Sequence, residues 1–309
     1  MDSRYDHTLA NQHIEAAEAV LLDSTLSPGD AANQVVALWR QAVVDADPTD
    51  FIEPNDTPGL SYFTECLWGH FLHIVQEDPA THDRLIAILT AIEAKGTEGC
   101  EGWQMWSSTF KWANLPGLRL EIREAMNGPE CTREDEYFDL LWRDPSARDA
   151  LAGEPVIDSP ASRTGAHARS RWLSLNRFLA HAWELGALDF AFYGMSTMRG
   201  LEAFTQPPEA RQNSITLGID DLEIETVAIW LCVAGGRIYE CRVGASGDRD
   251  WGVIDDIEKY HPDRWAQWKS ILVEISNSGG RPNMVDAAKA AVEAMDKFER
   301  EAMETPVVE

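Results

Sequence analysis

The feature that most constrains this fold is the helical spacing of bulky apolar residues in the stretch 171–183. These residues recur every three or four positions: Trp172, Leu175, Leu179 and Trp183. Such spacing places side chains on one face of a helix, and a neighbouring stripe through Asn176 widens that face, as is typical of a helix buried among others. Alternation of apolar and polar residues, which indicates strands, is scarce, and 237–243 is the single short candidate. The sequence therefore predicts an all-α fold.

Asn176 interrupts the apolar surface of this helix. A buried amide without hydrogen-bond partners costs about 1–3 kcal/mol, so a native fold has to supply them. We predict that Asn176 braces a neighbouring loop or helix end, and a catalytic role is the less favoured alternative.

The domain organisation follows from length and from the distribution of chain breakers. The chain has 309 residues, 44% of them hydrophobic, which is ample for a sizeable core. Prolines, glycines and serines gather in 144–168, where large apolar residues thin out, and this composition predicts a loop. We expect one helical domain over 1–309, with halves 1–143 and 169–309 joined by a loop at 144–168. Further helices are expected over 8–22, 31–44, 61–76, 79–95, 118–126, 134–142, 192–204, 220–234, 263–275 and 285–303.

The charge balance restricts the classes of partner. Asp and Glu number 52 against 26 Lys and Arg, for a formal net charge of −26. Such a charge repels polyanions and attracts cations. It disfavours nucleic acids and anionic membrane surfaces, and it favours a small cationic substrate such as one that carries a guanidinium.

The cysteines and the apolar runs bear on the compartment. The five cysteines are odd in number and form no Cys-x-x-Cys pair, so we expect free thiols in a reducing compartment. The polar N-terminus shows no signal peptide, and no apolar run approaches the roughly 20 residues that a membrane helix needs. A cytoplasmic protein without a membrane partner is expected.

The most suggestive chemical group is the acidic stretch 220–225, Asp-Asp-Leu-Glu-Ile-Glu. On a helix, Asp221 and Glu225 lie four residues apart and share a face. Crowded carboxylates at the start of an apolar helix could hold a guanidinium, an ammonium or a divalent cation, and could supply a general base. The alternative, which we favour on frequency, is that these acids simply complement the helix dipole.

Three other groups have both a chemical and a structural interpretation. His70 and His73 could bind a metal, but their spacing favours helix histidines satisfied by neighbours. The basic residues between Arg163 and Arg177 could meet a phosphate, but in so acidic a chain they are better explained as partners of carboxylates. The aromatic residues between Trp103 and Trp112 could line a pocket, but core packing is favoured.

Several tryptophan-rich motifs carry a resemblance to a known family. They are Phe110–Gly117 with Arg123–Ala125, the stretch 171–183 with Leu188–Met195 and Met198–Glu202, Val227–Trp230 with Ala234–Gly235, and Asp263–Lys269. Over roughly 35–300 the chain resembles a fungal family long catalogued as a domain of unknown function, also named after the oxopyrrolidine biosynthesis cluster protein G. These motifs are structural, so the resemblance identifies a family and a setting in fungal secondary metabolism better than a reaction.

A second, incomplete similarity concerns activity. Fungal arginine-containing cyclodipeptide synthases use aminoacyl-tRNA and depend on an Asp-Asp-x-x-Glu motif. Asp220-Asp221-Leu222-Glu223 is partly similar, although its further acidic residues fall at the fourth and sixth positions. Asp255-Asp256-Ile257-Glu258 departs from the motif in the same way. The similarity implies an aminoacyl-transferring enzyme, and the net charge disfavours aminoacyl-tRNA as its partner.

Two hypotheses of function follow. In the first, the chain is a biosynthetic transferase for an activated amino acid or a small cationic substrate, with no cofactor and no metal. Its catalytic residues are Asp221, Glu225 and Asn176, and its substrate-binding residues are Asp220, Glu223, Trp172 and His181. In the second, the chain is a non-catalytic helical binding or scaffold protein. The two differ in whether 220–225 opens into a pocket with Asn176 or His181.

Overall fold

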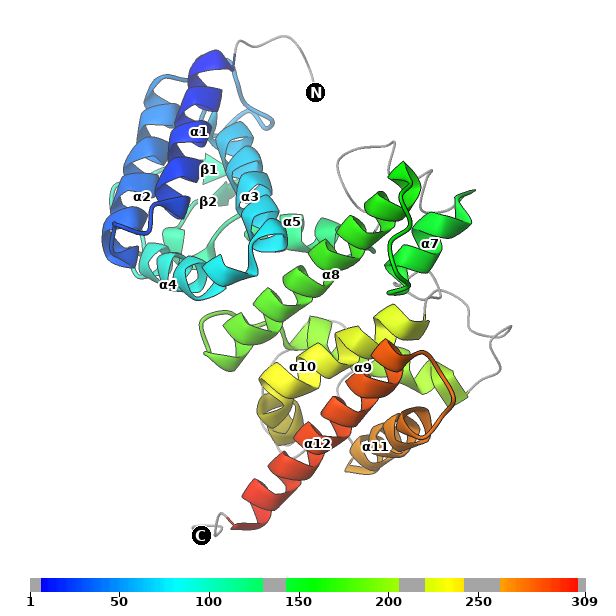
Figure 1. Cartoon of the computed structure of the whole chain (residues 1–309). Helices are drawn as coiled ribbons and strands as arrows, with labels where there is room; N and C mark the ends of the chain where they lie inside the picture. The colour runs from blue at the N-terminus through cyan, green and yellow to red at the C-terminus, as the bar shows by residue number, and fades with distance from the viewer. Residues whose placement is uncertain (1–6, 130–142, 206–219, 242–261, 305–309) are drawn as a thin grey trace. The chain divides into compact units, whose positions relative to one another are not determined.

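The computed structural model describes residues 7–129, 143–205, 220–241 and 262–304. These residues confirm the all-α prediction, since helices dominate and the described strands form one two-stranded sheet (Figure 1). The chain divides into two compact units, 1–126 and 127–309. The expected helix at 134–142 lies outside the described residues.

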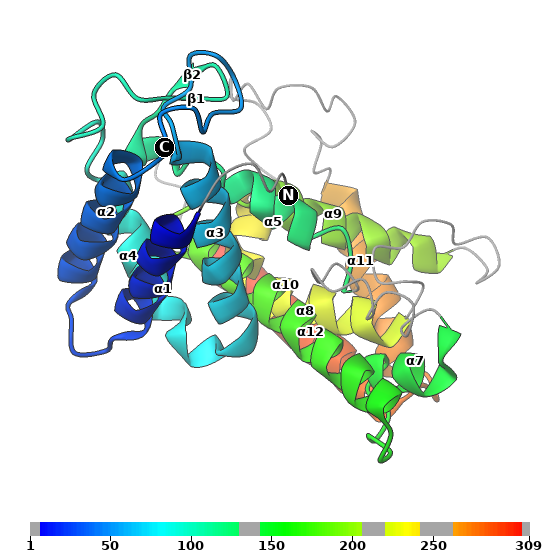
Figure 2. The same cartoon turned by 90° about the horizontal axis from the view of Figure 1, so that it is seen from above.

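The first unit contains five α-helices, two 3-10 helices and a hairpin in its described part. The α-helices are α1 (Thr8–Leu22), α2 (Pro28–Val44), α3 (Leu60–Glu77), α4 (His82–Glu93) and α5 (Leu118–Ala125); the other elements are η1 (Pro79–Thr81), β1 (Gln104–Met105), β2 (Ser108–Thr109) and η2 (Trp112–Asn114). Helix α1 packs against α2 and α3 (Figure 2). The antiparallel pairing of β1 with β2 was not expected from the sequence, because each strand has only two residues.

Interlocked aromatic rings form the core of the first unit. Trp39 stands edge-on to Trp112 at a centroid distance of 5.1 Å and to Trp68 at 5.5 Å. The indole N–H groups of Trp68 and Trp112 donate to the carbonyl oxygens of Pro116 and Glu98. The residues between Trp103 and Trp112 thus contribute to core packing, as favoured, because Phe110 and Trp112 are buried.

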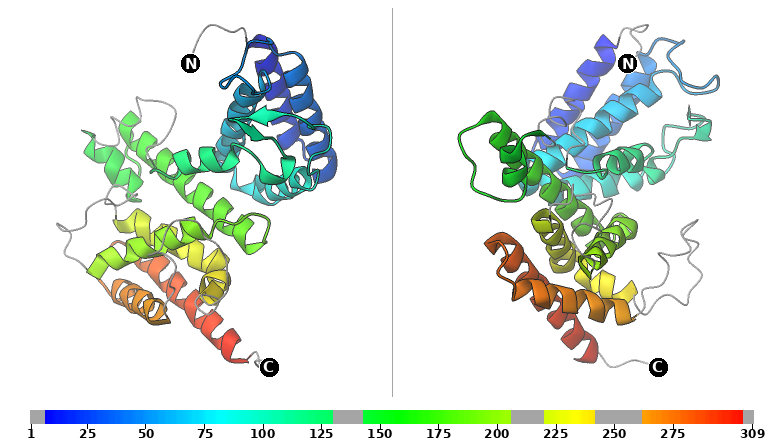
Figure 3. Two further views of the ribbon diagram at one scale, coloured as in Figure 1. Left: turned by 180° about the vertical axis from the view of Figure 1, so that it is seen from behind. Right: turned by 90° about the vertical axis from the view of Figure 1, so that its right-hand side faces the viewer.

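Every described secondary-structure element of the second unit is a helix. Its elements are α7 (Pro145–Leu151), α8 (Pro160–Glu184), α9 (Ala191–Glu202), η3 (Ala203–Thr205), α10 (Asp220–Cys241), α11 (Pro262–Ser276) and α12 (Pro282–Glu304). Helix α10 packs between α8 and α12, and α11 packs on α12 (Figure 3). The four bulky residues of 171–183 are all buried, as predicted: Trp172, Leu175, Leu179 and Trp183.

The predicted loop at 144–168 is wrong. Its residues form α7 and the first turns of α8, with the short connection 152–159 between them. Pro145 and Pro160 stand at the starts of α7 and α8, where Asp144 and Ser159 cap the helices through their side chains, and Pro155 lies in the connection between them. Proline is well tolerated at a helix start because the first helical N–H has no intrahelical partner. The small residues instead permit close packing of α7 on α8.

The stretch considered as a strand is also helical as far as Cys241. The helix bends at Ala234, whose backbone leaves the helical region just before the two glycines. In the part of the chain that the structure describes, no helix has both the length and the apolar character required to cross a membrane. Among the described residues, Cys66, Cys100 and Cys232 are reduced and form no disulfide.

Candidate functional site

A ladder of polar contacts joins α8 to α10. Arg169 pairs with Glu225, Trp172 Nε1 donates to Thr226 Oγ1 at 3.0 Å, and Trp230 Nε1 donates to Asn176 Oδ1 at 2.9 Å. A fourth contact runs from Arg237 Nε to the carbonyl oxygen of Glu184 at 3.0 Å. Residue numbers rise together on both helices, so α8 and α10 run parallel, and both present their N-terminal halves to the same end of the unit.

Asp221 lies at that end, in the first turn of α10, with 7% of its surface exposed. Its Oδ2 accepts a hydrogen bond from Arg281 Nη1 at 2.9 Å, while its buried Oδ1 has no hydrogen-bond partner. Burial raises the pKa of the Asp221 carboxyl above its ordinary value, and the nearby Arg281 guanidinium counteracts only part of that effect. Asp221 is therefore a proton acceptor with one unused oxygen.

Glu225 lies one turn further along the same face of α10. Its Oε2 pairs with Arg169 of α8, and its Oε1 accepts from Asn283 Nδ2 at 3.0 Å. The same Asn283 amide donates to the carbonyl oxygen of Ala152, which follows α7. Helices α8 and α12 thus both contact this carboxylate of α10, and Asn283 links it to the residue that follows α7.

These residues form an ionic network, which we call the α10 charge cluster and define as Asp221, Glu225, Glu154, Arg169 and Arg281. The side chains of Asp221 and Glu225 are largely buried, whereas those of Glu154 and Arg281 are partly exposed. Arg281 joins Glu154 to the network through a contact of 2.9 Å from its Nε. Glu225 thus pairs with Arg169, and Asp221 and Glu154 both pair with Arg281. Asp221 and Glu225 each pair with an arginine of the chain, and the basic residue Arg169 pairs with a carboxylate, as favoured.

The structure places Asn176 outside this cluster. Its side chain is fully buried, and its Nδ2 donates to the Trp172 carbonyl oxygen one turn earlier on α8. With Trp230 on its Oδ1, the amide has the structural bracing role that we favoured, although it braces α8 against the middle of α10 and not against a loop or a helix end. Asn176 was expected to orient the carboxylates of Asp221 and Glu225, but neither of its two hydrogen bonds goes to them. Trp172 is likewise buried in the interface between the two helices.

The remaining predicted residues lie at other positions on α8 and α10. Asp220 is half-buried at the start of α10. Glu223 points towards α9, since a Cβ at Gly200 would lie 2.2 Å from its Oε1. His181 is half-buried on α8, beyond Asn176 in the direction away from Arg169.

Sequence reasoning missed Arg281, Asn283 and Glu154. Each lies about 60 residues or more from Asp221 in the chain, and only the packing of α12 on α10 and of α7 on α8 brings them there. The single local signal was the sequence Gly-Gly-Arg-Pro at 279–282, in which an arginine immediately precedes a proline-initiated helix.

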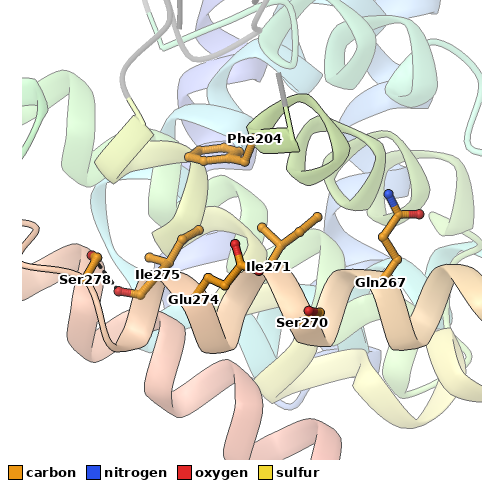
Figure 4. Close-up of a pocket in the computed structure, with 7 residues that line it drawn as sticks. All are labelled: Phe204, Gln267, Ser270, Ile271, Glu274, Ile275 and Ser278. Atoms are coloured by element: carbon orange, nitrogen blue, oxygen red, sulfur yellow. Dashed lines mark hydrogen bonds between the residues drawn. The ribbon is translucent and has the colours of Figure 1, made fainter. Parts of the chain in front are cut away.

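An open pocket of about 380 Å³ lies elsewhere in the second unit, along α11. Figure 4 shows Phe204 of η3 facing Ile271 and Ile275 across it, with Glu274 as its charged group. None of the predicted site residues lines this pocket. The α10 charge cluster and the pocket are therefore separate features.

The histidine pair in the first unit has neighbours of its own. His70 Nδ1 lies 2.5 Å from Glu18 Oε2 of α1, and His73 is exposed. Histidines satisfied by neighbours were the favoured interpretation, and the His70 contact agrees with it.

Comparison with known proteins yields one family. The family described as "Protein of unknown function (DUF3632)" matches residues 68–272, more than half of the chain. Neither the curated proteins nor the solved structures contain a match.

Proposed function

The chain belongs to the DUF3632 family of proteins of unknown function, and we propose that it is a biosynthetic transferase of fungal secondary metabolism. The substrate in this proposal is a small cationic compound or an activated amino acid, as for the arginine-containing cyclodipeptide synthases. The α10 charge cluster is the proposed site, with Asp221 and Glu225 as its acidic residues.

The observation that carries the proposal is the state of the Asp221 carboxylate. It is buried beside a guanidinium, one of its oxygens has no hydrogen-bond partner, and its pKa is raised. A carboxylate whose pKa is shifted towards neutrality is a better general base than an exposed one, and perturbed carboxylates are concentrated at functional sites.

The proposed reaction is aminoacyl transfer. The substrate amine loses a proton to Asp221 and attacks the carbonyl carbon of an activated aminoacyl ester. A C–N bond forms, the ester C–O bond breaks, and the proton passes to the departing oxygen. Glu225, itself held by Arg169 and Asn283, fixes the face of α10 that carries Asp221, while Asn176 and Trp172 keep α8 and α10 in register.

The test is expression of the full chain in a host supplied with amino acids, with mass spectrometry of small products. Asp221→Asn and Glu225→Gln should each lower product formation, and loss of a proton-transfer residue should lower the rate by about 10²–10⁴-fold. Asp158→Asn is the matched control, because that side chain is 99% exposed in a pair with Arg163. Equal products from all four proteins would contradict the proposed site.

A second function is supported by the α11 pocket. A pocket lined by Phe204, Ile271 and Ile275 beside one carboxylate suits a non-catalytic protein that binds an apolar ligand with a positive end. In that case no new product should form from any variant. Binding of hydrophobic amines should then weaken in Ile271→Asp, whereas Asp221→Asn should leave it unchanged.

A further inference from the structure

Arg281 occupies an unusual position for a residue in an ionic network. It immediately precedes α12, and its carbonyl oxygen accepts the first helical hydrogen bond from Val285 N–H at 3.0 Å. Two glycines, Gly279 and Gly280, come directly before it, and glycine has wide backbone freedom. The Arg281 side chain is 41% exposed, so its guanidinium can leave the cluster without moving a helix.

Arg169 differs in each of these respects. It lies inside α8, its side chain is only 26% exposed, and its partner Glu225 is also held by Asn283. Removal of Arg169 from Glu225 would require a change in the packing of α8 on α10. Of the two guanidiniums, Arg281 is the one placed for release.

Arg281 also satisfies Asp221 incompletely. It bonds Oδ2 through Nη1 and turns its Nε to Glu154, which leaves the buried Oδ1 without a hydrogen bond. A guanidinium that approached the carboxylate with two parallel N–H groups would bond both oxygens, and such bidentate pairs are the strong ones. Arg281 therefore binds Asp221 less tightly than a guanidinium that is free to take the bidentate orientation would.

We propose that Arg281 is an internal latch: its guanidinium occupies the binding position at Asp221 and swings out when a substrate guanidinium replaces it. This inference rests on the proposed function of the α10 charge cluster. A tethered group competes as if present at a concentration on the order of millimolar. A ligand must therefore offer the bidentate geometry to displace it, and a lysine-like ammonium, which is a point charge, fails.

The latch predicts that removing Arg281 increases affinity. The probe is L-arginine methyl ester, titrated calorimetrically into the full-length wild-type protein and into Arg281→Ala, with L-lysine methyl ester as the comparison ligand. Arg281→Ala should bind the arginine ester about tenfold more tightly than wild type, and the lysine ester should gain by the same factor while it binds more weakly than the arginine ester to both proteins. Arg163→Ala, which removes an arginine that is 59% exposed, should bind as wild type does. If Arg281→Ala does not fold, Arg281→Gln keeps the side-chain length and allows the same comparison.

The outcomes separate the latch from the function. Equal affinity of wild type and both Arg281 variants for the arginine ester would overturn the latch and leave the proposed function standing. Tighter binding of the arginine ester that Asp221→Asn abolishes would support both. No binding by any folded variant would overturn the latch, and unchanged products from Asp221→Asn would then overturn the proposed function on independent grounds.

Discussion

At the scale of single residues, Asn176 couples two helices through one side chain. Asn176→Leu removes the acceptor of the buried Trp230 N–H, and an orphaned buried donor costs about 1–3 kcal/mol. We expect this loss in the free energy of unfolding measured with urea. Trp230→Phe removes the donor itself, so the double variant should be less destabilised than the sum of the single variants. Strictly additive losses would show that the bond does not couple the helices.

Asp221 should make stability depend on pH. Its folded pKa is raised, mainly by burial, so the folded state favours the protonated carboxyl. The stability that protonation provides is fully present below the unfolded pKa of about 4, and it is lost as pH rises through the folded pKa. Asp221→Asn should therefore gain stability relative to wild type across that window and keep a constant difference at higher pH. Denaturant unfolding at a series of pH values measures this difference, with the exposed Asp158→Asn as the control. A difference that shrinks as pH rises would contradict the assignment.

At the scale of elements, the close contact between α7 and α8 requires a residue without a side chain at position 165, which is a glycine. A Cβ at Gly165 would lie 1.9 Å from the carbonyl oxygen of Ala147, so Gly165→Ala must push the two helices apart. Overpacking of this kind typically costs about 1–3 kcal/mol, and thermal unfolding should reveal it. Gly29→Ala in α2 is the control, since its Cβ would meet only Ser27 Oγ at 3.9 Å. Equal melting temperatures for the two variants would refute the close contact.

The same scale shows what the sequence could and could not predict. The helix at 171–183 was predictable because its apolar period is determined by the helix itself. The helical state of 144–168 was not, because proline and serine signal both a break and a helix start, and only capping by Asp144 and Ser159 decides between them. Asp221 and Glu225 were selected as candidate site residues from their charge and spacing. Arg281 was not, because its place in the cluster depends on how α12 packs against α10.

At the scale of the whole molecule, the net charge of −26 should make stability sensitive to salt. Like charges repel each other more strongly in the compact state, and salt screens exposed charges over about 10 Å at 0.1 M. We expect the melting temperature to rise between 20 and about 300 mM NaCl. The same concentrations should weaken binding of a cationic ester. A melting temperature that falls with added NaCl would mean that attractive ion pairs, such as those of Lys269 with Asp296 and Glu299, outweigh the overall repulsion.

The parallel course of α8 and α10 has a mechanical consequence. Force applied along the axes, pulling one helix past the other, would stretch the contacts at Glu225, Thr226, Trp230 and Arg237 together. Force applied across the axes would break the same contacts one after another, beginning at one end of the helix pair. The pair should therefore resist sliding far better than peeling, and α10 should be easiest to detach from one of its ends.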